Sequence, residues 1–183
     1  MGSQGEVLSA DLHKATFAGG CFWCMQPPFA QLEGVVSTTV GYTGGDKPDP
    51  TYEEVSSGTT GHVEAIQVVY DPNKVSYDVL LGLFWRSIDP TDPRGQFADQ
   101  GSQYRTAIFY QDEEQRRLAE ESKKLLTGSG RFRKPIATAI LPAKPFYPAE
   151  EYHQQYYRTH SIQYKLYKKG SGREDFLEKT WGR

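Results

Sequence analysis

Residues 15–32 read ATFAGGCFWCMQPPFAQL, and this stretch sets the first steps of the fold. The apolar run at 15–18 predicts a strand, and the glycines at 19 and 20 predict a turn after it. Beyond the turn, apolar residues recur at helical spacing, namely at Phe22, Met25, Phe29 and Leu32. Pro27 and Pro28 fit such a helix only in its first turn. Cys21 is therefore expected at a turn from a strand into a helix.

The same signals predict further elements on both sides of two long polar loops. Strands are expected at residues 35–42, 62–70, 104–110 and 135–141, helices at 76–88, 112–126 and 148–160, and loops at 43–61 and 89–103. From residue 14 to residue 110 the order is β-α-β-β-α-β, as in ferredoxin-like sandwiches. We therefore expect an α+β fold built on this split βαβ sandwich, with an extra C-terminal strand, a helix and an irregular tail.

Length and composition are those of one compact domain. The chain has 183 residues, of which 37% are hydrophobic and 24% are charged. We expect a flexible N-terminus at 1–13 and a single domain at 14–162. The polar tail at 163–183 is expected to pack on that domain or to fray from it.

The charge balance and hydropathy argue against two classes of partner. The 21 basic and 23 acidic residues give a net charge of −2, without the basic excess that binds phosphate backbones. No run of about 18 apolar residues could span a membrane, and the N-terminus lacks the basic and apolar regions of a secretion signal. We therefore expect a cytoplasmic protein that binds neither nucleic acid nor membrane.

Cys21 and Cys24 are the 2 cysteines of the chain. A thiol at the N-terminus of a helix is stabilised as a thiolate by backbone N–H groups and the helix dipole, which lower its pKa from about 8.5. The alternative is a small buried hydrophobe that happens to follow a strand. Cys24 favours the reactive role, because residues i and i+3 of a helix face the same side with Cβ atoms about 5–6 Å apart. A second thiol there could resolve an oxidised Cys21.

A C-x-x-C pair also suggests a zinc site or a thioredoxin-like redox motif. A closed zinc site needs four ligands, and the 4 histidines are scattered through the sequence without an H-x₃₋₅-H pair. Thioredoxin-like motifs typically hold Gly-Pro between the cysteines rather than Phe-Trp, and their order of elements differs from the one predicted here. We therefore expect a redox nucleophile and no metal.

Four further residues are candidates because of where they lie. Glu64 shares one face of its predicted strand with the apolar residues Ile66, Val68 and Tyr70. Such a carboxyl group either meets water at the open end of the strand or sits in a poorly solvated pocket, with the raised pKa that a general acid needs. Tyr52 and Tyr104 each adjoin a long loop, and Asp99 lies within one, where aspartate is most often a turn former.

Several short motifs join these positions and, read together, resemble one enzyme family. They are Gly20-Cys-Phe-Trp23, Gly41-Tyr-Thr-Gly-Gly45, Tyr52-Glu-Glu-Val55, Gly61-His-Val-Glu64, Asp99-Gln-Gly-Ser-Gln-Tyr-Arg105 and Tyr147-Pro-Ala-Glu-Glu-Tyr-His-Gln154. Over about residues 14–160 the set resembles the A-type peptide-methionine sulfoxide reductases, which reverse methionine oxidation. The resemblance implies a nucleophile at Cys21 and a pocket for the S-methyl group of the substrate at Phe22 and Trp23. It also implies groups around the sulfoxide oxygen at Tyr52, Glu64 and Tyr104, and a supporting carboxylate at Asp99.

The chemistry of this family agrees with the residues. A sulfoxide sulfur becomes electrophilic only when its oxygen is protonated or hydrogen-bonded. Cys21 would attack the sulfur while Glu64 gives a proton to the oxygen, which leaves methionine and a sulfenic acid on Cys21. Cys24 would then form a Cys21–Cys24 disulfide that thioredoxin or a similar dithiol reopens. We expect a monomer that reduces S-configured methionine sulfoxide, free or in proteins, without a cofactor.

Three features depart from the pattern of the family. Many members carry resolving cysteines in a C-terminal tail, whereas residues 164–183 hold none. Gln26 stands where glutamate is common, and Ser56 stands where cysteine is common. Because the tail holds no cysteine, recycling of Cys21 would use Cys24 or an external thiol directly. Two rival functions stay open: a thiol-binding or metal-binding module without catalysis, and a disulfide oxidoreductase that acts on protein dithiols.

Overall fold

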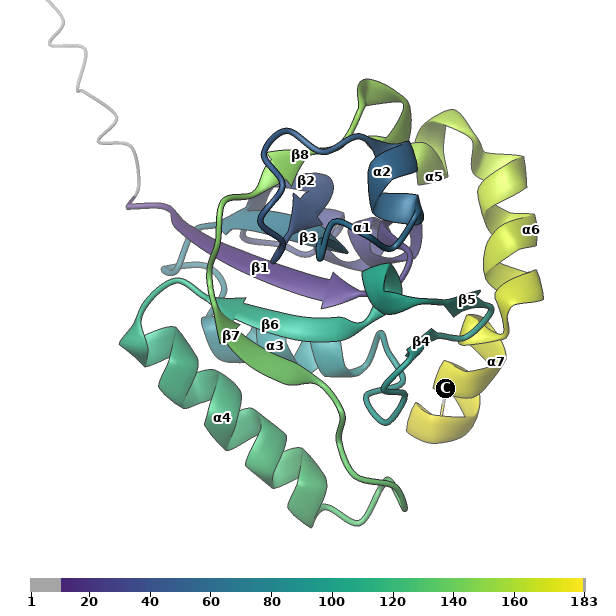
Figure 1. The fold of residues 1–183 in the computed structure, drawn as a ribbon. Coiled ribbons are helices and arrows are strands. Elements are labelled where there is room, and N and C mark those ends of the chain that lie inside the picture. Colours follow the sequence, from purple (N-terminus) through teal and green to yellow (C-terminus); the bar gives the residue numbers. More distant parts are fainter. Residues whose placement is uncertain (1–10, 183) are drawn as a thin grey trace, which may run out of the picture.

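The computed structural model of the chain describes residues 11–182 (Figure 1). Most of the predicted flexible N-terminus, residues 1–13, lies outside the described residues. Its last residue, His13, already begins the first strand. Within residues 11–182, no helix combines the length and the hydropathy that crossing a lipid bilayer requires.

A six-stranded sheet forms the centre of the molecule. Its strands are β1 (His13–Gly19), β2 (Val35–Thr43), β3 (Val63–Tyr70), β6 (Thr106–Tyr110), β7 (Ala139–Pro142) and β8 (Tyr147–Pro148). The spatial order is β7-β6-β1-β3-β2-β8, and every neighbouring pair is antiparallel except β6 and β7. The predicted strands are confirmed, although the one expected at 135–141 is shortened to 139–142. The fold is a mixed α+β fold with a mostly antiparallel sheet.

Three helices pack on one face of this sheet. They are α1 (Phe22–Ala30), α3 (Tyr77–Trp85) and α4 (Glu113–Gly128), and they share the main apolar core with β1 and β3. Ser76 caps α3 by accepting from the N–H of Val79, and Asp112 caps α4 by accepting from the N–H of Gln115. The helices predicted at 76–88 and 112–126 are therefore confirmed.

Phe17 lies at the centre of the core. It is fully buried and stacks on Phe29 of α1 and Phe84 of α3, with ring centroids 5.4 and 5.0 Å apart. Truncating a buried aromatic side chain to alanine typically costs about 3–5 kcal/mol of stability. The core therefore fixes the end of β1 relative to α1, and Cys21 lies between these two elements.

The two long loops carry short ordered elements that the sequence did not predict. α2 (Tyr52–Ser56) begins with a capping box in which Thr51 and Glu54 exchange hydrogen bonds. β4 (Gly95–Gln96) and β5 (Asp99–Gln100) form a small hairpin, and the 3-10 helix η1 (Ser102–Tyr104) follows it. Tyr104 lies in η1 rather than in the strand predicted at 104–110.

The helix predicted at 148–160 is wrong. Tyr147–Pro148 pair with β2 as β8, the 3-10 helix η2 (Glu151–His153) follows, and Gln155 turns the chain with a φ of 53°. Only α5 (Tyr156–Thr159) is α-helical. The side chain of Gln154 explains the difference, because it bonds the backbone of Val40 and Ala149 at 2.8–3.0 Å and so ties the segment to the sheet.

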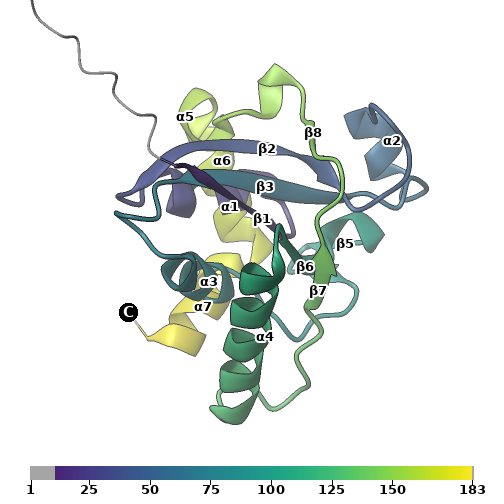
Figure 2. The ribbon, with the colours of Figure 1, turned by 90° about the vertical axis from the view of Figure 1, so that its left-hand side faces the viewer.

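The tail that was expected to be irregular is helical and packs on the domain. α6 (Ser161–Ser171) and α7 (Arg173–Trp181) run down one edge of the molecule, beside β4 and β5 (Figure 1). Arg86, at the C-terminal end of α3, lies over the ring of Trp181 in α7, and Figure 2 shows α2 on the opposite side of the molecule from these helices. Arg173 anchors this tail. It is buried, and its guanidinium group donates to the carbonyl oxygens of Gly19 and Ser87 at 2.9 and 2.6 Å.

The interior of α1 holds two prolines, where the prediction allowed them only in the first turn. Pro27 and Pro28 are the sixth and seventh residues of this nine-residue helix. Neither has an N–H, so the carbonyl oxygens of Trp23 and Cys24 lose their usual i+4 donors. Tertiary packing holds the helix instead, through the buried side chains of Phe22, Met25 and Phe29.

Candidate active site

A small cavity of about 110 Å³ lies where α1, α2, β3, β5, η1 and α6 meet. Its lining residues are Cys21, Phe22, Trp23, Tyr52, Glu64, Asp99, Tyr104 and Tyr167. All of the candidate residues except Cys24 are therefore brought together, and Tyr167 is added to them. A larger hollow, of about 730 Å³, lies between α7 and residues 129–134, but neither cysteine lines it.

The turn into α1 places Cys21 at the cavity. Gly20 has a φ of +84°, which a residue with a Cβ rarely adopts, and a Cβ there would lie 2.6 Å from the side chain of Gln96. Cys21 is the N-cap residue of α1. The predicted position of the thiol, at a turn from strand to helix, is confirmed.

The two cysteines are reduced, buried and in contact. The N–H of Cys24 donates to the carbonyl oxygen of Cys21 at 3.1 Å, and the two side chains lie in one buried cluster with Tyr156 and Tyr164. Burial raises the pKa of the Cys21 thiol well above its ordinary value, and the neighbouring Cys24 thiol and the charges of Glu64 and Asp99 raise it further. The expectation that the helix N-terminus lowers this pKa is therefore wrong, because desolvation outweighs the dipole.

Glu64 meets the thiol from the neighbouring strand β3. Its side chain is only 2% exposed, so the alternative of a carboxylate in water at the end of the strand is wrong. Burial raises its pKa to about 8, while the N–H of Phe22, which donates to Oε1 at 3.2 Å, opposes that shift. The carboxyl group is therefore protonated at neutral pH. A proton donor and a thiol thus face the same small cavity.

Tyr52 and Tyr104 supply two hydroxyl groups to the same cavity. Tyr104 and Ser56, the residue that replaces a common cysteine, both lie near the Tyr52 hydroxyl and oppose the rise in its pKa. Burial raises the pKa of both tyrosines, and the nearby Glu64 adds to the shift. Both hydroxyls therefore stay protonated and can donate to an oxygen atom in the cavity.

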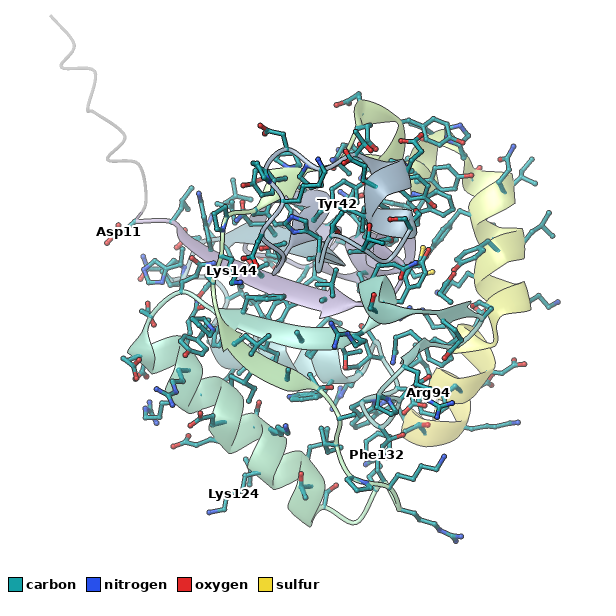
Figure 3. All side chains as sticks on the ribbon, in the orientation of Figure 1. Asp11, Tyr42, Arg94, Lys124, Phe132 and Lys144 are labelled. Carbon is teal, nitrogen blue, oxygen red and sulfur yellow. The ribbon has the colours of Figure 1, made fainter. Side chains whose placement is uncertain are left out.

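Stacked aromatic rings hold Trp23 in the cavity wall. Its ring lies 3.9 Å from that of Tyr156, nearly parallel to it, and its Nε1–H donates to Nδ1 of His153 at 3.1 Å. This bond needs an unprotonated Nδ1, in agreement with the lowered pKa that burial gives His153. Phe22 packs on the fully buried Tyr42 of β2, which is labelled beside α2 in Figure 3. The sequence motif contained His153, but its position there gave no sign of a contact with Trp23.

Gln26, where the family often has glutamate, is fully buried. Its Nε2 donates to Oγ1 of Thr38 at 3.1 Å, and its Oε1 accepts from the N–H of Gln155 at 2.8 Å. An ionised glutamate could keep only the second of these bonds. The amide thus joins α1 to β2 and to the start of α5.

Asp99 reaches the cavity from β5 and bonds a residue of the C-terminal tail. The hydroxyl of Tyr167 donates to its Oδ2. Burial raises the pKa of Asp99, and the positive charge of Arg173 partly offsets that shift. Among residues 11–182, no three His, Cys, Asp or Glu side chains form a group that could hold a metal ion.

Comparison with known proteins places the chain in a family. The sequence model described as peptide methionine sulfoxide reductase matches residues 13–183. The peptide methionine sulfoxide reductase MsrA of Bacillus licheniformis is 60% identical over 169 residues, which are 92% of this chain and 93% of that protein.

Solved structures agree with the sequence match. Mxr1 from Saccharomyces cerevisiae, in its reduced form, superposes with a TM-score of 0.75 at 33% identity, over 84% of this chain and 88% of that one. Mxr1 in complex with Trx2 superposes with a TM-score of 0.56 at 26% identity, over 81% of this chain and 86% of that one. This chain belongs to the peptide methionine sulfoxide reductase family.

Proposed function

We propose that this chain reduces S-configured methionine sulfoxide, free and within proteins, to methionine. The observation that carries the proposal is a buried thiol, Cys21, that shares one aromatic-walled cavity with a buried and protonated carboxyl group, Glu64. Thiol attack on a sulfoxide needs this pair, because the oxygen must gain a proton as the sulfur is attacked. Membership of the family supports the same activity.

Different residues of the cavity would contact different parts of the substrate. The rings of Phe22 and Trp23 form the apolar wall that would take the S-methyl group. Glu64 and the hydroxyls of Tyr52 and Tyr104 are the donors that would meet the sulfoxide oxygen. A cavity of about 110 Å³ suits the end of one side chain, which agrees with a substrate held in a protein.

The first step oxidises Cys21 and reduces the substrate. Sγ of Cys21 attacks the sulfoxide sulfur as Glu64 gives its proton to the oxygen, and the carboxylate so formed takes up the thiol proton. The bond that the attack forms between Sγ and the substrate sulfur then breaks together with the S–O bond of the substrate, as the protonated oxygen passes from that sulfur to Sγ. Methionine leaves, and Cys21 becomes a sulfenic acid. The substrate sulfur gains two electrons and the thiol loses two. Because burial keeps the thiol protonated at rest, this proton exchange also supplies the thiolate at the moment of attack.

The second step restores Cys21 through Cys24. The thiol of Cys24 attacks the sulfenic acid, water leaves, and a Cys21–Cys24 disulfide forms. The packing of both free cysteines in one buried cluster supports this assignment. Thioredoxin or a similar dithiol would reduce the disulfide, and the complex of the relative Mxr1 with Trx2 supports that choice of partner. We propose that the protein acts as a cytoplasmic monomer.

The arrangement of strands supports a ferredoxin-like core for the reductase domain. β1, β2, β3 and β6 lie in the order β6-β1-β3-β2, all antiparallel, and α1 and α3 share one face. We place this core and the elements up to residue 162 in a single domain, on which the helical tail packs.

The test is incubation of the protein with racemic methionine sulfoxide and dithiothreitol, followed by chiral analysis of what remains. The S epimer should be consumed while the R epimer persists, because a pocket that fixes both the methyl group and the oxygen accepts one hand at sulfur. Cys21→Ser is the inactive control. Equal loss of both epimers would contradict the proposal, and reduction of insulin without any sulfoxide would favour the disulfide oxidoreductase instead.

A further inference from the structure

We infer that Tyr167, in the C-terminal helix α6, is a positioning residue of the reductase site that acts by holding the carboxyl group of Asp99. This inference rests on the proposed function. It makes the tail part of the active site, although only packing or fraying was predicted for this segment from the sequence.

Tyr167 touches the cavity in two ways. Its hydroxyl donates to Oδ2 of Asp99, and its ring meets that of Trp23 edge to face, with centroids 5.9 Å apart at 83°. Both partners line the same cavity. The Tyr167 side chain therefore contacts both Trp23, in the apolar wall of the cavity, and Asp99, the carboxyl group in its lining.

The bond matters because the support of Asp99 is otherwise small. Asp99 lies on β5, a two-residue strand paired only with the two-residue strand β4 among the described residues. Its carboxylate is also one of the charges that raise the pKa of both Cys21 and Glu64. Its position therefore affects the two groups that exchange the proton. A donor on a well-anchored helix fixes that position before the substrate arrives.

α6 is such a helix. On its inner side Tyr164 is buried and packs beside Cys21 and Cys24. After its C-terminal end, Arg173 bonds the carbonyl oxygens of Gly19 and Ser87. Its outer side carries Ile162 and Leu166, which are 71% and 69% exposed. The helix is thus held on the side that carries Tyr167 and free on the other.

The experiment is a double-mutant cycle with Tyr167→Phe, Asp99→Asn and the double variant, read as kcat and KM for S-methionine sulfoxide with dithiothreitol as reductant. Tyr167→Phe removes only the hydroxyl. We expect kcat/KM to fall about tenfold, mostly through a higher KM. Without the hydroxyl of Tyr167 the Asp99 side chain is no longer held in place, so part of the binding energy of the substrate must be used to order it. The double variant should be no slower than Asp99→Asn alone, because the two residues act through one bond.

Leu166→Ala, on the same helix, is the matched control and should keep wild-type kinetics. Thermal unfolding of all variants separates local from global effects. A Tyr167→Phe variant with wild-type KM would overturn the inference, and so would losses that add fully in the double variant. An inactive wild-type protein would instead contradict the proposed function and leave these comparisons without a reference rate.

Discussion

The substitution Glu64→Gln should make the protein more stable at neutral pH while it removes most of the activity. In the folded protein the pKa of Glu64 is about 8, against an ordinary value of 4.5. Between these two values the folded state holds a proton that the unfolded state has lost, so the free energy of unfolding falls as the pH rises. Each pH unit costs about 1.4 kcal/mol, and the 2.5 units from 4.5 to pH 7 therefore cost about 3–3.5 kcal/mol. Glutamine removes this cost because it carries no charge.

Glutamine can keep the hydrogen bond of Glu64, so the difference in stability between the variant and the wild type reports the effect of the Glu64 charge. Oε1 of Glu64 accepts from the N–H of Phe22, and the amide oxygen of glutamine can accept the same bond. Urea unfolding at pH 5 and pH 7 measures the effect. The stability gained by the variant should grow from below about 1 kcal/mol at pH 5 to about 3 kcal/mol at pH 7. Glu53→Gln, which changes an exposed carboxylate on α2, is the control and should show no such growth.

The same substitution, Glu64→Gln, should slow the first step of the reaction although it stabilises the protein. Glutamine donates a hydrogen bond but cannot release a proton, so the single-turnover rate of methionine formation should fall by about 10²–10⁴-fold at pH 7. The wild-type rate should itself fall as the pH rises through about 8, where Glu64 loses its proton. A variant that is no more stable at pH 7 than at pH 5, relative to wild type, would show that Glu64 is ionised in the folded protein. The reasoning about the proton donor would then be refuted.

Two more predictions concern recycling and the tail. Cys24→Ser should still form about one methionine per protein molecule in a single turnover but should lose most turnover with thioredoxin; normal cycling would mean that Cys24 is not the resolving thiol. Arg173→Ala should lower the free energy of unfolding by about 2–4 kcal/mol, because the carbonyl oxygens of Gly19 and Ser87 lose a charged donor and a buried volume is left empty. Urea unfolding against the exposed control Lys179→Ala checks this, and equal midpoints would contradict it.

Local signals predicted the first part of the fold well. Ser76 and Asp112 stand where helices begin, and their side chains do cap α3 and α4. The sequence could not predict the segment around Gln154, since that side chain bonds the backbone of Val40, more than a hundred residues away. Contacts over such distances override local helical preference.

The helices of the C-terminal tail were not predicted, and the reason is different. α6 buries Tyr164 but exposes Ile162 and Leu166, so its apolar residues do not mark its inner face. Several residues of the cavity were candidates from their positions alone, but their grouping into one site could be predicted only from the resemblance to a family, because they come from six separate elements. Tyr167 and Arg173 had no such signal, and the pKa of Cys21 depends on a burial that spacing along a helix does not reveal.

The two prolines inside α1 have a mechanical consequence for the redox cycle. A disulfide brings its two Cβ atoms to about 3.5–4.5 Å, closer than the 5–6 Å or so of residues i and i+3 in a regular helix. In the proposed cycle, the chain between Cys21, the N-cap of α1, and Cys24 would therefore tighten whenever the two thiols join and relax whenever they part. Because Pro27 and Pro28 offer no N–H to the carbonyl oxygens of Trp23 and Cys24, this turn can change shape without breaking those two bonds. A first turn without these two bonds would let the proposed oxidation and reduction alternate through a change confined to a few residues of α1.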